Sequence, residues 1–509
     1  DEPLFDGPVL HSNKSYKVYT ADFVTTKEGT GIVHTAVMYG EDDFALGQKE
    51  GLPMVQLLNA NGTYNELAPE FIRGEYFKKA EKLIKVHLED QGLLFKKENH
   101  THSYPHCYRC GTALIYNAVP SWFINIQKIK QKMLAENERV NWVPAHLKHG
   151  RFKHIVENAP DWTISRNRFW ASALPIWKEK GGSKLMVIGS LQELLQKTKK
   201  SGNSYFVMRH GEAQSNVEHI FDVHGRTDDK LTESGRQGVL KSALTLKKKT
   251  GIDMVVVSPL PRTRETAKII QNAFDLPDTA VMVDERLREM NVGPYDGRSV
   301  VEWWSSLGSG AEPFDTVPEG AETYTEIRRR VGDFLFDIER RYTGKRILIL
   351  THECPAWLLN SIALRWSLEQ CKEDADAKLF LHVGQVKELP FIPYPHNKNY
   401  ELDLHRPYID AVTLVDAKDR SYERIPAVVD CWVESGVMPY ASNHYPFENK
   451  EIFNPGRLWG LWPKGFPADF IAEYIAQTRT WFYYMHAMGI LLSGGRSFRN
   501  VVSTGTILA

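Results

Sequence analysis

Short apolar runs that end in a basic side chain constrain the fold of this chain more than any other feature. The first run, Tyr205 to Met208, is followed directly by Arg209, His210 and Gly211. Its length is typical of a buried strand, and parallel sheets present reactive side chains where their strands end. A guanidinium can hold two phosphate oxygens, and a neutral imidazole can attack phosphorus. Taken alone, the tripeptide favours the plainer interpretation of a His at a strand end, because the chain contains 18 histidines.

Later stretches repeat the pattern of an apolar run that ends in a basic side chain, and they favour phosphate chemistry over the plainer interpretation. Residues 254–257 are apolar, and a turn then leads to Arg262 at the start of a predicted helix, where free backbone N–H groups favour an anion. Residues 347–350 form another apolar run, which ends in Thr351 and His352. Between them, Glu289 lies in a predicted loop, where a carboxyl group can protonate a leaving oxygen. Together these stretches indicate a site for phosphate chemistry.

The four stretches resemble the histidine phosphatase superfamily over about residues 203–393. The resemblance implies a three-layer α/β/α fold, a phosphohistidine intermediate on His210 and proton donation by Glu289. It also implies that the substrate is a phosphorylated small molecule. The residues that it assigns to the phosphate pocket are Arg209, Asn216, Arg262 and His352.

A helix within this region is strongly predicted by its own pattern. Thr323 and Glu326 have the spacing of a capping box, which satisfies free N–H groups at a helix start. Apolar residues then recur on one face of the helix, at Ile327, Val331, Phe334, Leu335 and Ile338.

Glu353 departs from the family, which more often has small glycines after the second His. A carboxylate directed into the phosphate pocket would oppose a bound dianion, and this is the arrangement that we expect. If Glu353 turned to solvent or paired with a neighbouring Arg, its charge would be screened and phosphate binding would be ordinary for the family.

The length of 509 residues exceeds what one core supports and predicts two to four domains. Lys plus Arg equals Asp plus Glu at 63 each, so the chain has no overall positive charge of the kind that indicates DNA binding. No apolar run approaches the ~20 residues of a membrane span. Five cysteines and the lack of a signal peptide predict a cytoplasmic location. Because the chain starts with Asp and ends in an apolar run, we expect it to be part of a longer protein.

The first hundred residues mix strand and helix signals. Residues 16–24 alternate as a half-buried strand does, and residues 29–36 are typical of a glycine turn into another strand. The acids Asp42 and Asp43 follow Gly40, and their spacing favours a helix N-terminus. A further helix is predicted from about residue 75 to residue 90.

Cys107 and Cys110 form the one Cys-x-x-Cys pair, which supplies half of a tetrahedral zinc site. The other three cysteines are isolated in the sequence. A closed zinc site would therefore need His102 or His106, or ligands outside this chain, and the sequence leaves both possibilities open.

The flanks of the phosphatase-like region resemble the isoleucyl-tRNA synthetases. The resemblance rests on residues 29–44, 102–116, 158–177, 403–410 and 429–449, including Asn-Ala-Pro-Asp-Trp-Thr-Ile-Ser-Arg-Asn-Arg-Phe-Trp from Asn158. It implies an α/β multidomain chain in which the phosphatase-like domain is an insertion. The expected domains are a β-rich editing part at 1–115, a Rossmann-type class I catalytic domain in two segments at 116–201 and 394–509, and the insertion at 202–393.

This second resemblance also implies binding sites and partners. Asp43 would hold the α-amino group of a misattached amino acid in an editing pocket, with His34 beside the side chain of that amino acid, so that misacylated valyl-tRNA is hydrolysed. The aminoacyl-adenylate site would be lined by Trp432, Glu434, Glu473 and Gln477. The implied partners are tRNA(Ile), isoleucine and ATP with Mg²⁺.

Two departures bear on the adenylate chemistry. Tyr474 and Ala476 stand where the family has Gly and Asp, so a ring is expected where the backbone should approach the adenylate, and an acceptor for the ribose hydroxyls is missing. We therefore do not expect this chain to form an adenylate. The alternative to an active ligase is a decayed or noncatalytic synthetase, in which the phosphatase domain is the one active enzyme or a docking module.

Overall fold

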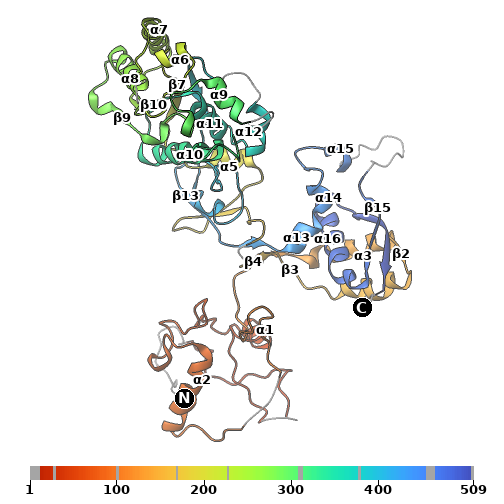
Figure 1. The fold of residues 1–509 in the computed structure, drawn as a ribbon. Coiled ribbons are helices and arrows are strands. Elements are labelled where there is room, and N and C mark those ends of the chain that lie inside the picture. Colours follow the sequence, from red (N-terminus) through yellow and green to blue (C-terminus); the bar gives the residue numbers. More distant parts are fainter. Residues whose placement is uncertain are drawn as a thin grey trace. The chain divides into compact units, whose positions relative to one another are not determined.

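The computed structural model describes residues 12–26, 30–98, 103–167, 170–225, 228–307, 313–375, 380–453 and 465–505. The chain divides into two compact units, residues 1–121 and residues 122–509 (Figure 1). Among the described residues, no helix is both long and apolar enough to cross a membrane.

The described part of the first unit consists of helices and loops. Its helices are α1 (Glu41–Glu50), the short 3-10 helix η1 (Glu70–Ile72) and α2 (Phe77–Asp90), and α2 confirms the helix predicted over residues 75–90. Gly40 is the N-cap residue of α1, and three acidic residues fill the first turn, where they complement the helix dipole.

The strand predicted at residues 16–24 is wrong, and the described part of residues 29–36 also contains no strand. Alternation alone does not make a strand, because each strand needs a neighbour to bind its N–H and C=O groups. The described residues of this unit form only isolated bridges, such as Leu58 with Tyr64, and Val18 is 93% exposed rather than half-buried.

A five-stranded sheet organises the middle of the second unit. Its order is β11-β7-β10-β8-β9, and all strands are parallel except β11 at the edge. The strands are β7 (Ser204–Arg209), β8 (Met254–Val257), β9 (Val281–Val283), β10 (Arg346–Thr351) and β11 (Val386–Leu389). The three apolar runs of the sequence thus become the three central strands.

Helices cover both faces of this sheet, as expected for three layers (Figure 1). One face packs on α7 (Glu233–Lys249) and α8 (Pro261–Phe274), and the other packs on α10 (Tyr324–Arg341) and α11 (Glu353–Ala363). Side chains alternate between the two cores along each strand: Val207 faces one core and Met208 the other. Shorter helices complete the domain: α6 (Gln214–Glu218), α9 (Val300–Ser306), α12 (Leu368–Ala375), and the 3-10 turns η4 (Asp278–Ala280), η5 (Glu285–Leu287) and η6 (Gly293–Tyr295).

The core on the α10 face continues past residue 393 into the returning chain. Tyr400 is buried against Gly332 of α10, so closely that a Cβ on Gly332 would lie 2.2 Å from its ring. Arg328 is fully buried, and its guanidinium donates to the carbonyl oxygens of Asn399 (2.8 Å) and Tyr400 (3.0 Å). The returning segment is therefore an integral part of the packing of this domain.

The chain before and after this domain meets in a separate four-stranded sheet. Its order is β12-β13-β5-β6, from β5 (Ile176–Glu179), β6 (Leu185–Val187), β12 (Leu414–Val415) and β13 (Ser421–Arg424), with α5 (Leu191–Lys197) packed on its core. Arg420 forms ion pairs with Asp416 and with Glu179. Strands that precede the domain in the chain are thus joined to strands that follow it by hydrogen bonds and by an ion pair.

A second parallel sheet, β15-β16-β2, contains a β-α-β unit in which α16 links β15 to β16. This unit matches the expected Rossmann-type segment. Its members are β2 (Asn141–Val143), β15 (Ala468–Tyr474), β16 (Phe498–Thr504) and α16 (Trp481–Ser493). Smaller elements around it are α3 (Lys130–Glu138), α4 (Lys153–Glu157), α13 (Cys431–Gly436), α14 (Met438–Ala441), α15 (Lys450–Phe453), the π-helical turn η3 (Lys148–Phe152), the 3-10 helices η2 (Ile126–Lys128), η7 (Ile409–Ala411) and η8 (Ile475–Arg479), and the short strands β1 (Phe123–Ile124), β3 (Trp162–Thr163), β4 (Ser165–Arg166) and β14 (Val428–Val429).

Candidate functional site

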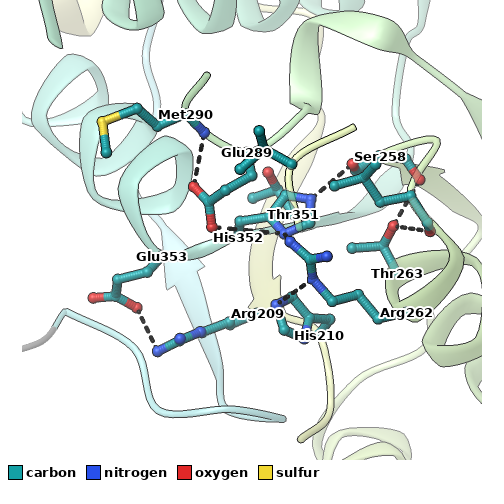
Figure 2. Close-up of polar contacts among 12 residues, drawn as sticks. Arg209, His210, Ser258, Arg262, Thr263, Glu289, Met290, Thr351, His352 and Glu353 are labelled. Atoms are coloured by element: carbon teal, nitrogen blue, oxygen red, sulfur yellow. Dashed lines mark hydrogen bonds and ion pairs between the residues drawn. The ribbon is translucent and has the colours of Figure 1, made fainter. Parts of the chain in front are cut away.

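The ends of the three central strands bring the predicted phosphate residues together (Figure 2). Arg209 is the last residue of β7, and His210 follows it. His352 follows β10, which pairs with β7 on one side and β8 on the other. The turn after β8 places Arg262 in the first turn of α8. Because parallel strands end at the same sheet edge, residues up to 143 positions apart converge in one site.

His210 is 1% exposed, and its hydrogen bonds define its tautomer. Nδ1 lies 2.7 Å from the carbonyl oxygen of Gly211, so it carries the proton and donates. Nε2 accepts from Nε of Arg262 at 3.1 Å. Burial and the charges of Arg262 and Arg209 lower the pKa of His210 well below its usual value. The ring is therefore neutral, with a lone pair on Nε2 that faces a guanidinium.

His352 is also fully buried, and its ring centroid lies 5.1 Å from that of His210. Its Nδ1 accepts from Nη2 of Arg262 at 3.2 Å, so Nε2 carries the proton and donates to Oγ of Ser258 at 2.8 Å. Burial and the neighbouring charge of Arg262 lower its pKa. One guanidinium thus binds both imidazoles.

Arg262 is held from behind by a buried ion pair. Its Nη1 lies 3.1 Å from Oδ2 of Asp229 and donates to the carbonyl oxygen of Asp222 at 2.8 Å. Asp229 is 3% exposed and also accepts from the backbone N–H (3.0 Å) and the hydroxyl (2.7 Å) of Ser215. These bonds fix the guanidinium toward the histidines. Sequence reasoning missed Asp229, because Asp228-Asp229-Lys230 is typical of an exposed turn.

Glu289 approaches the same cluster from the loop after η5. Its Oε1 accepts from the backbone N–H of Met290 at 2.9 Å, and its Oε2 lies 3.7 Å from Nδ1 of His352. Burial raises its pKa above the usual value. A carboxyl group that retains its proton at a higher pH can serve as a proton donor.

Glu353, the residue that departs from the family, lines the pocket and also pairs with an arginine (Figure 2). Its Oε2 lies 3.3 Å from Nη1 of Arg209. Its Oε1 accepts from the backbone N–H groups of Phe380 (2.6 Å) and Leu381 (3.2 Å). Burial raises the pKa of Glu353, while the charge of Arg209 lowers it. Glu353 therefore both lines the phosphate pocket and pairs with an arginine, which are two arrangements that the sequence left open as alternatives.

A cavity of about 390 Å³ opens at this cluster. Arg209, His210, Arg262 and Glu289 line it, as does Asn216, whose Oδ1 accepts from the backbone N–H of Ala213 at 3.0 Å. Four of the five predicted catalytic residues thus share one cavity with Asn216, and the fifth, His352, is not among the lining residues but is bound by Arg262 at 3.2 Å. The arrangement can bind an anion, supply a neutral nucleophile and donate a proton.

A second cavity, of about 310 Å³, lies in the Rossmann-type segment and contains three of the four predicted adenylate residues. Trp432, Glu473 and Gln477 line it, while Glu434 instead accepts from the backbone N–H of Ser172 at 2.9 Å. Tyr474 is not among its lining residues, and its φ of −74° requires no glycine. The expected steric block by Tyr474 is thus not seen in the cavity wall.

The predicted editing residues lie in the first unit. Asp43 is partly buried, burial raises its pKa, and its Oδ1 has no hydrogen-bond partner in the described part of the chain. His34 is exposed. No hydrogen bond or ion pair between the two is found among the described residues.

The cysteine pair does not complete a metal site. Within the described ranges, no group of three or more His, Cys, Asp or Glu side chains could hold a metal ion. The Sγ of Cys110 instead lies 3.2 Å from the hydroxyl of Thr112. Nδ1 of His106 lies 2.9 Å from the carbonyl oxygen of Tyr104. His102 lies outside the described residues. Two thiols are half of a tetrahedral zinc site, so the described residues do not fit zinc on their own.

Two family models match the chain, and residues 205–232 are matched by both. A family model of the histidine phosphatase superfamily (branch 1) matches residues 205–375. A family model of the class I tRNA synthetases (I, L, M and V) matches residues 15–232 and 395–509, more than half of the chain.

The curated relatives include isoleucine–tRNA ligases from three bacteria. That of Thermus thermophilus is 27% identical over 495 residues, that of Streptomyces avermitilis 28% over 498, and that of Chlamydia trachomatis 27% over 511. The first two alignments cover 97% of this chain and 28% of the ligase, and the third covers 100% and 29%. The chain thus spans less than a third of the length of the curated relatives it matches.

Two solved structures are similar to about a third of the chain. Bacillus stearothermophilus YhfR is 23% identical, with a TM-score of 0.32, and the match covers 36% of this chain and 90% of YhfR. A mycobacterial glucosyl-3-phosphoglycerate phosphatase is 21% identical, with a TM-score of 0.32, and the match covers 36% of this chain and 91% of that protein. From the two family models, the chain belongs to the class I tRNA synthetases and carries a histidine phosphatase domain between its synthetase segments.

Proposed function

We propose that the inserted domain hydrolyses phosphomonoesters through a phosphohistidine on His210. The observation that carries the proposal is the fixed tautomer of this buried ring, whose unprotonated Nε2 faces Arg262 Nε at 3.1 Å. Arg209, Arg262 and Asn216 line the cavity and would bind the phosphate oxygens, and Arg262 also binds His352 at 3.2 Å.

The reaction would have two steps. Nε2 of His210 forms a bond to phosphorus while the ester P–O bond breaks, and the leaving alcohol takes the proton of Glu289. Water then gives its proton to Glu289 and attacks phosphorus. The P–N bond breaks, and inorganic phosphate leaves. The raised pKa of Glu289 and the lowered pKa of His210 suit these opposite roles.

The test is release of inorganic phosphate from phenyl phosphate by the whole 509-residue chain. Turnover above the rate in buffer is expected. A chain that is folded by circular dichroism and binds phosphate but releases none from this ester would contradict the proposal.

Glu353 is expected to compete with phosphate for Arg209. Glu353→Gln removes the charge but keeps an oxygen for the N–H groups of Phe380 and Leu381. Inhibition by inorganic phosphate should tighten about fivefold, since a net hydrogen bond is worth ~1 kcal/mol. The pKa of Glu353 is raised, so its carboxyl becomes neutral as the pH falls through that value, and the difference between the two proteins should shrink there.

The measurement is the inhibition constant of phosphate at fixed ionic strength. Glu233→Gln on α7 is the matched control, because it removes the same charge from a residue that does not line the cavity. Equal constants for the parent and Glu353→Gln would mean that Glu353 does not compete with the anion.

For the synthetase segments, we propose that the chain contributes editing and catalytic parts of an isoleucine–tRNA ligase. The proposed partners are tRNA(Ile), isoleucine and ATP with Mg²⁺, and the proposed sites are Asp43 with His34 for editing and the cavity at Trp432, Glu473 and Gln477 for the adenylate. The names of the relatives and this cavity support the proposal.

Adenylate formation by this chain alone is not expected, because Ala476 lacks the carboxylate that the family uses for the ribose hydroxyls. Isoleucine-dependent exchange of pyrophosphate into ATP measures the step directly. Exchange should equal that of a sample without isoleucine, and a clear isoleucine-dependent rate would contradict this expectation.

A further inference from the structure

The part of the cavity that surrounds the phosphate cluster has an aromatic wall. Phe221, Trp304, Tyr324, Trp357 and Phe380 line it, together with aliphatic side chains. These rings come from separate elements: Trp304 lies on α9, Tyr324 on α10 and Trp357 on α11. Binding pockets with apolar walls and a few polar groups take ligands that are themselves largely apolar.

The wall is preformed around Trp357. Its ring contacts those of Tyr324 and Phe314 edge to face, with centroids 5.4 Å and 6.3 Å apart. Its indole N–H donates to Oδ2 of Asp374 at 2.8 Å. A ring held by two neighbours and a hydrogen bond loses little freedom when a ligand packs on it. Trp304, by contrast, is 47% exposed and leaves much of its indole surface for a ligand.

The charges of the lining are unevenly distributed. Its two cations are Arg209 and Arg262. Arg209 donates to Glu353, and Arg262 donates to His210. Four carboxyl groups also line the cavity, those of Asp222, Glu289, Glu353 and Asp374. Among the described lining residues, no cation is left to pair with a second anionic group of a substrate. A substrate with a carboxylate or second phosphate would instead meet carboxyl groups.

From this wall and this charge distribution we infer that the site acts on phosphomonoesters of apolar aromatic alcohols that carry no anion other than the phosphate. The inference rests on the proposed phosphatase function and adds to it the class of leaving group. The phosphate would occupy the Arg209–Arg262 end of the cavity, and the aromatic group would pack on Trp304 and Trp357.

Four esters test the inference on the whole chain: phenyl, 1-naphthyl, 4-carbamoylphenyl and 4-carboxyphenyl phosphate. The naphthyl ester should exceed the phenyl ester in kcat/KM by about tenfold, since its second ring removes more apolar area from water. The carbamoyl and carboxyl esters match in size but differ by one charge. The carboxyl ester should have a kcat/KM lower by about tenfold, because like charges repel in a partly buried site.

Variants separate the wall from the phosphate end. Trp304→Ala should lower kcat/KM for naphthyl phosphate about fivefold, through KM, and leave the inhibition constant of inorganic phosphate unchanged. Trp170→Ala is the matched control, since Trp170 is 77% exposed and is not among the lining residues. Asp374→Asn keeps an acceptor for Trp357 and should reduce the discrimination between carbamoyl and carboxyl esters.

The outcomes distinguish this inference from the proposed function. Hydrolysis of none of the four esters by a folded chain would overturn both. Hydrolysis of all four without preference, or with preference for the carboxyl ester, would overturn the assigned leaving group and leave the phosphatase activity standing. Preference for the naphthyl ester that is lost in Trp304→Ala but kept in Trp170→Ala is the result that we expect.

Discussion

His210→Ala in the whole chain is expected to lower kcat for aryl phosphates by at least about a thousandfold, because removal of a nucleophile abolishes the covalent route. The ring is buried, its Nε2 is bound by Arg262 at 3.1 Å, and it is the one imidazole among the described residues that line the cavity. His352 is not expected to replace it, because His210 lines the cavity whereas His352 is not among the lining residues, and its Nε2 carries a proton directed at Ser258. Initial rates with phenyl and 4-nitrophenyl phosphate measure the loss.

Two controls make this result specific. His149→Ala changes an exposed histidine of the synthetase part, whose side chain is 63% exposed, and should leave the rate unchanged. His210→Gln keeps a hydrogen-bonding group in the buried site and should be as inactive as His210→Ala while unfolding at a similar temperature. A His210→Ala protein that retained the parent rate would show that the nucleophile lies elsewhere.

Glu289→Gln is expected to lower the rate with phenyl phosphate by about 10²- to 10⁴-fold, the usual contribution of a general acid. The amide cannot give a proton to the leaving oxygen. The loss should be much smaller with 4-nitrophenyl phosphate, whose leaving group needs little protonation. Rates with the two esters, compared between parent and variant, are the measurement. Equal losses with both esters would mean that Glu289 acts in binding or folding and not as a proton donor.

The pH profile should reflect the same two groups. The pKa of His210 is lowered, so the ring stays neutral below its usual value of 6.5, and activity falls only when the pH drops through the lowered pKa. The pKa of Glu289 is raised above 4.5, so its proton is lost, and activity falls, as the pH rises through the raised pKa. The optimum is therefore expected on the acid side, and Glu289→Gln should remove the alkaline limb.

The sequence was most informative where each local signal agreed with the tertiary fold. The runs before Arg209, Arg262 and His352 became neighbouring parallel strands because they were long enough and apolar on both faces. The predicted capping box also formed: the backbone N–H of Thr323 donates to Glu326 at 2.8 Å, and the helix buries Ile327 and the other apolar residues predicted for one face. Strand ends and helix starts then fixed where the site had to lie.

Prediction failed where partners far apart in sequence decide the result. Residues 16–24 show the alternation that is typical of a half-buried strand, but no strand pairs with them in the described part of the chain. Asp229 becomes buried only because Arg262 and Ser215 approach it from other elements. Glu353 illustrates the same limit, since its carboxylate serves Arg209 and the N–H groups of Phe380 and Leu381 at once. No local pattern encodes such a set of contacts.

Chemical trapping of the phosphoenzyme tests the central claim most directly. The whole chain is mixed with a ³²P-labelled aryl phosphate, quenched in alkali within milliseconds to seconds, and digested for peptide mapping. Label should appear on the peptide that contains His210, should survive alkali and be lost in acid as a phosphohistidine is, and should be missing from His210→Ala. Hydrolysis of the ester with no labelled His210 peptide, or an acid-stable label on another residue, would contradict a mechanism through His210.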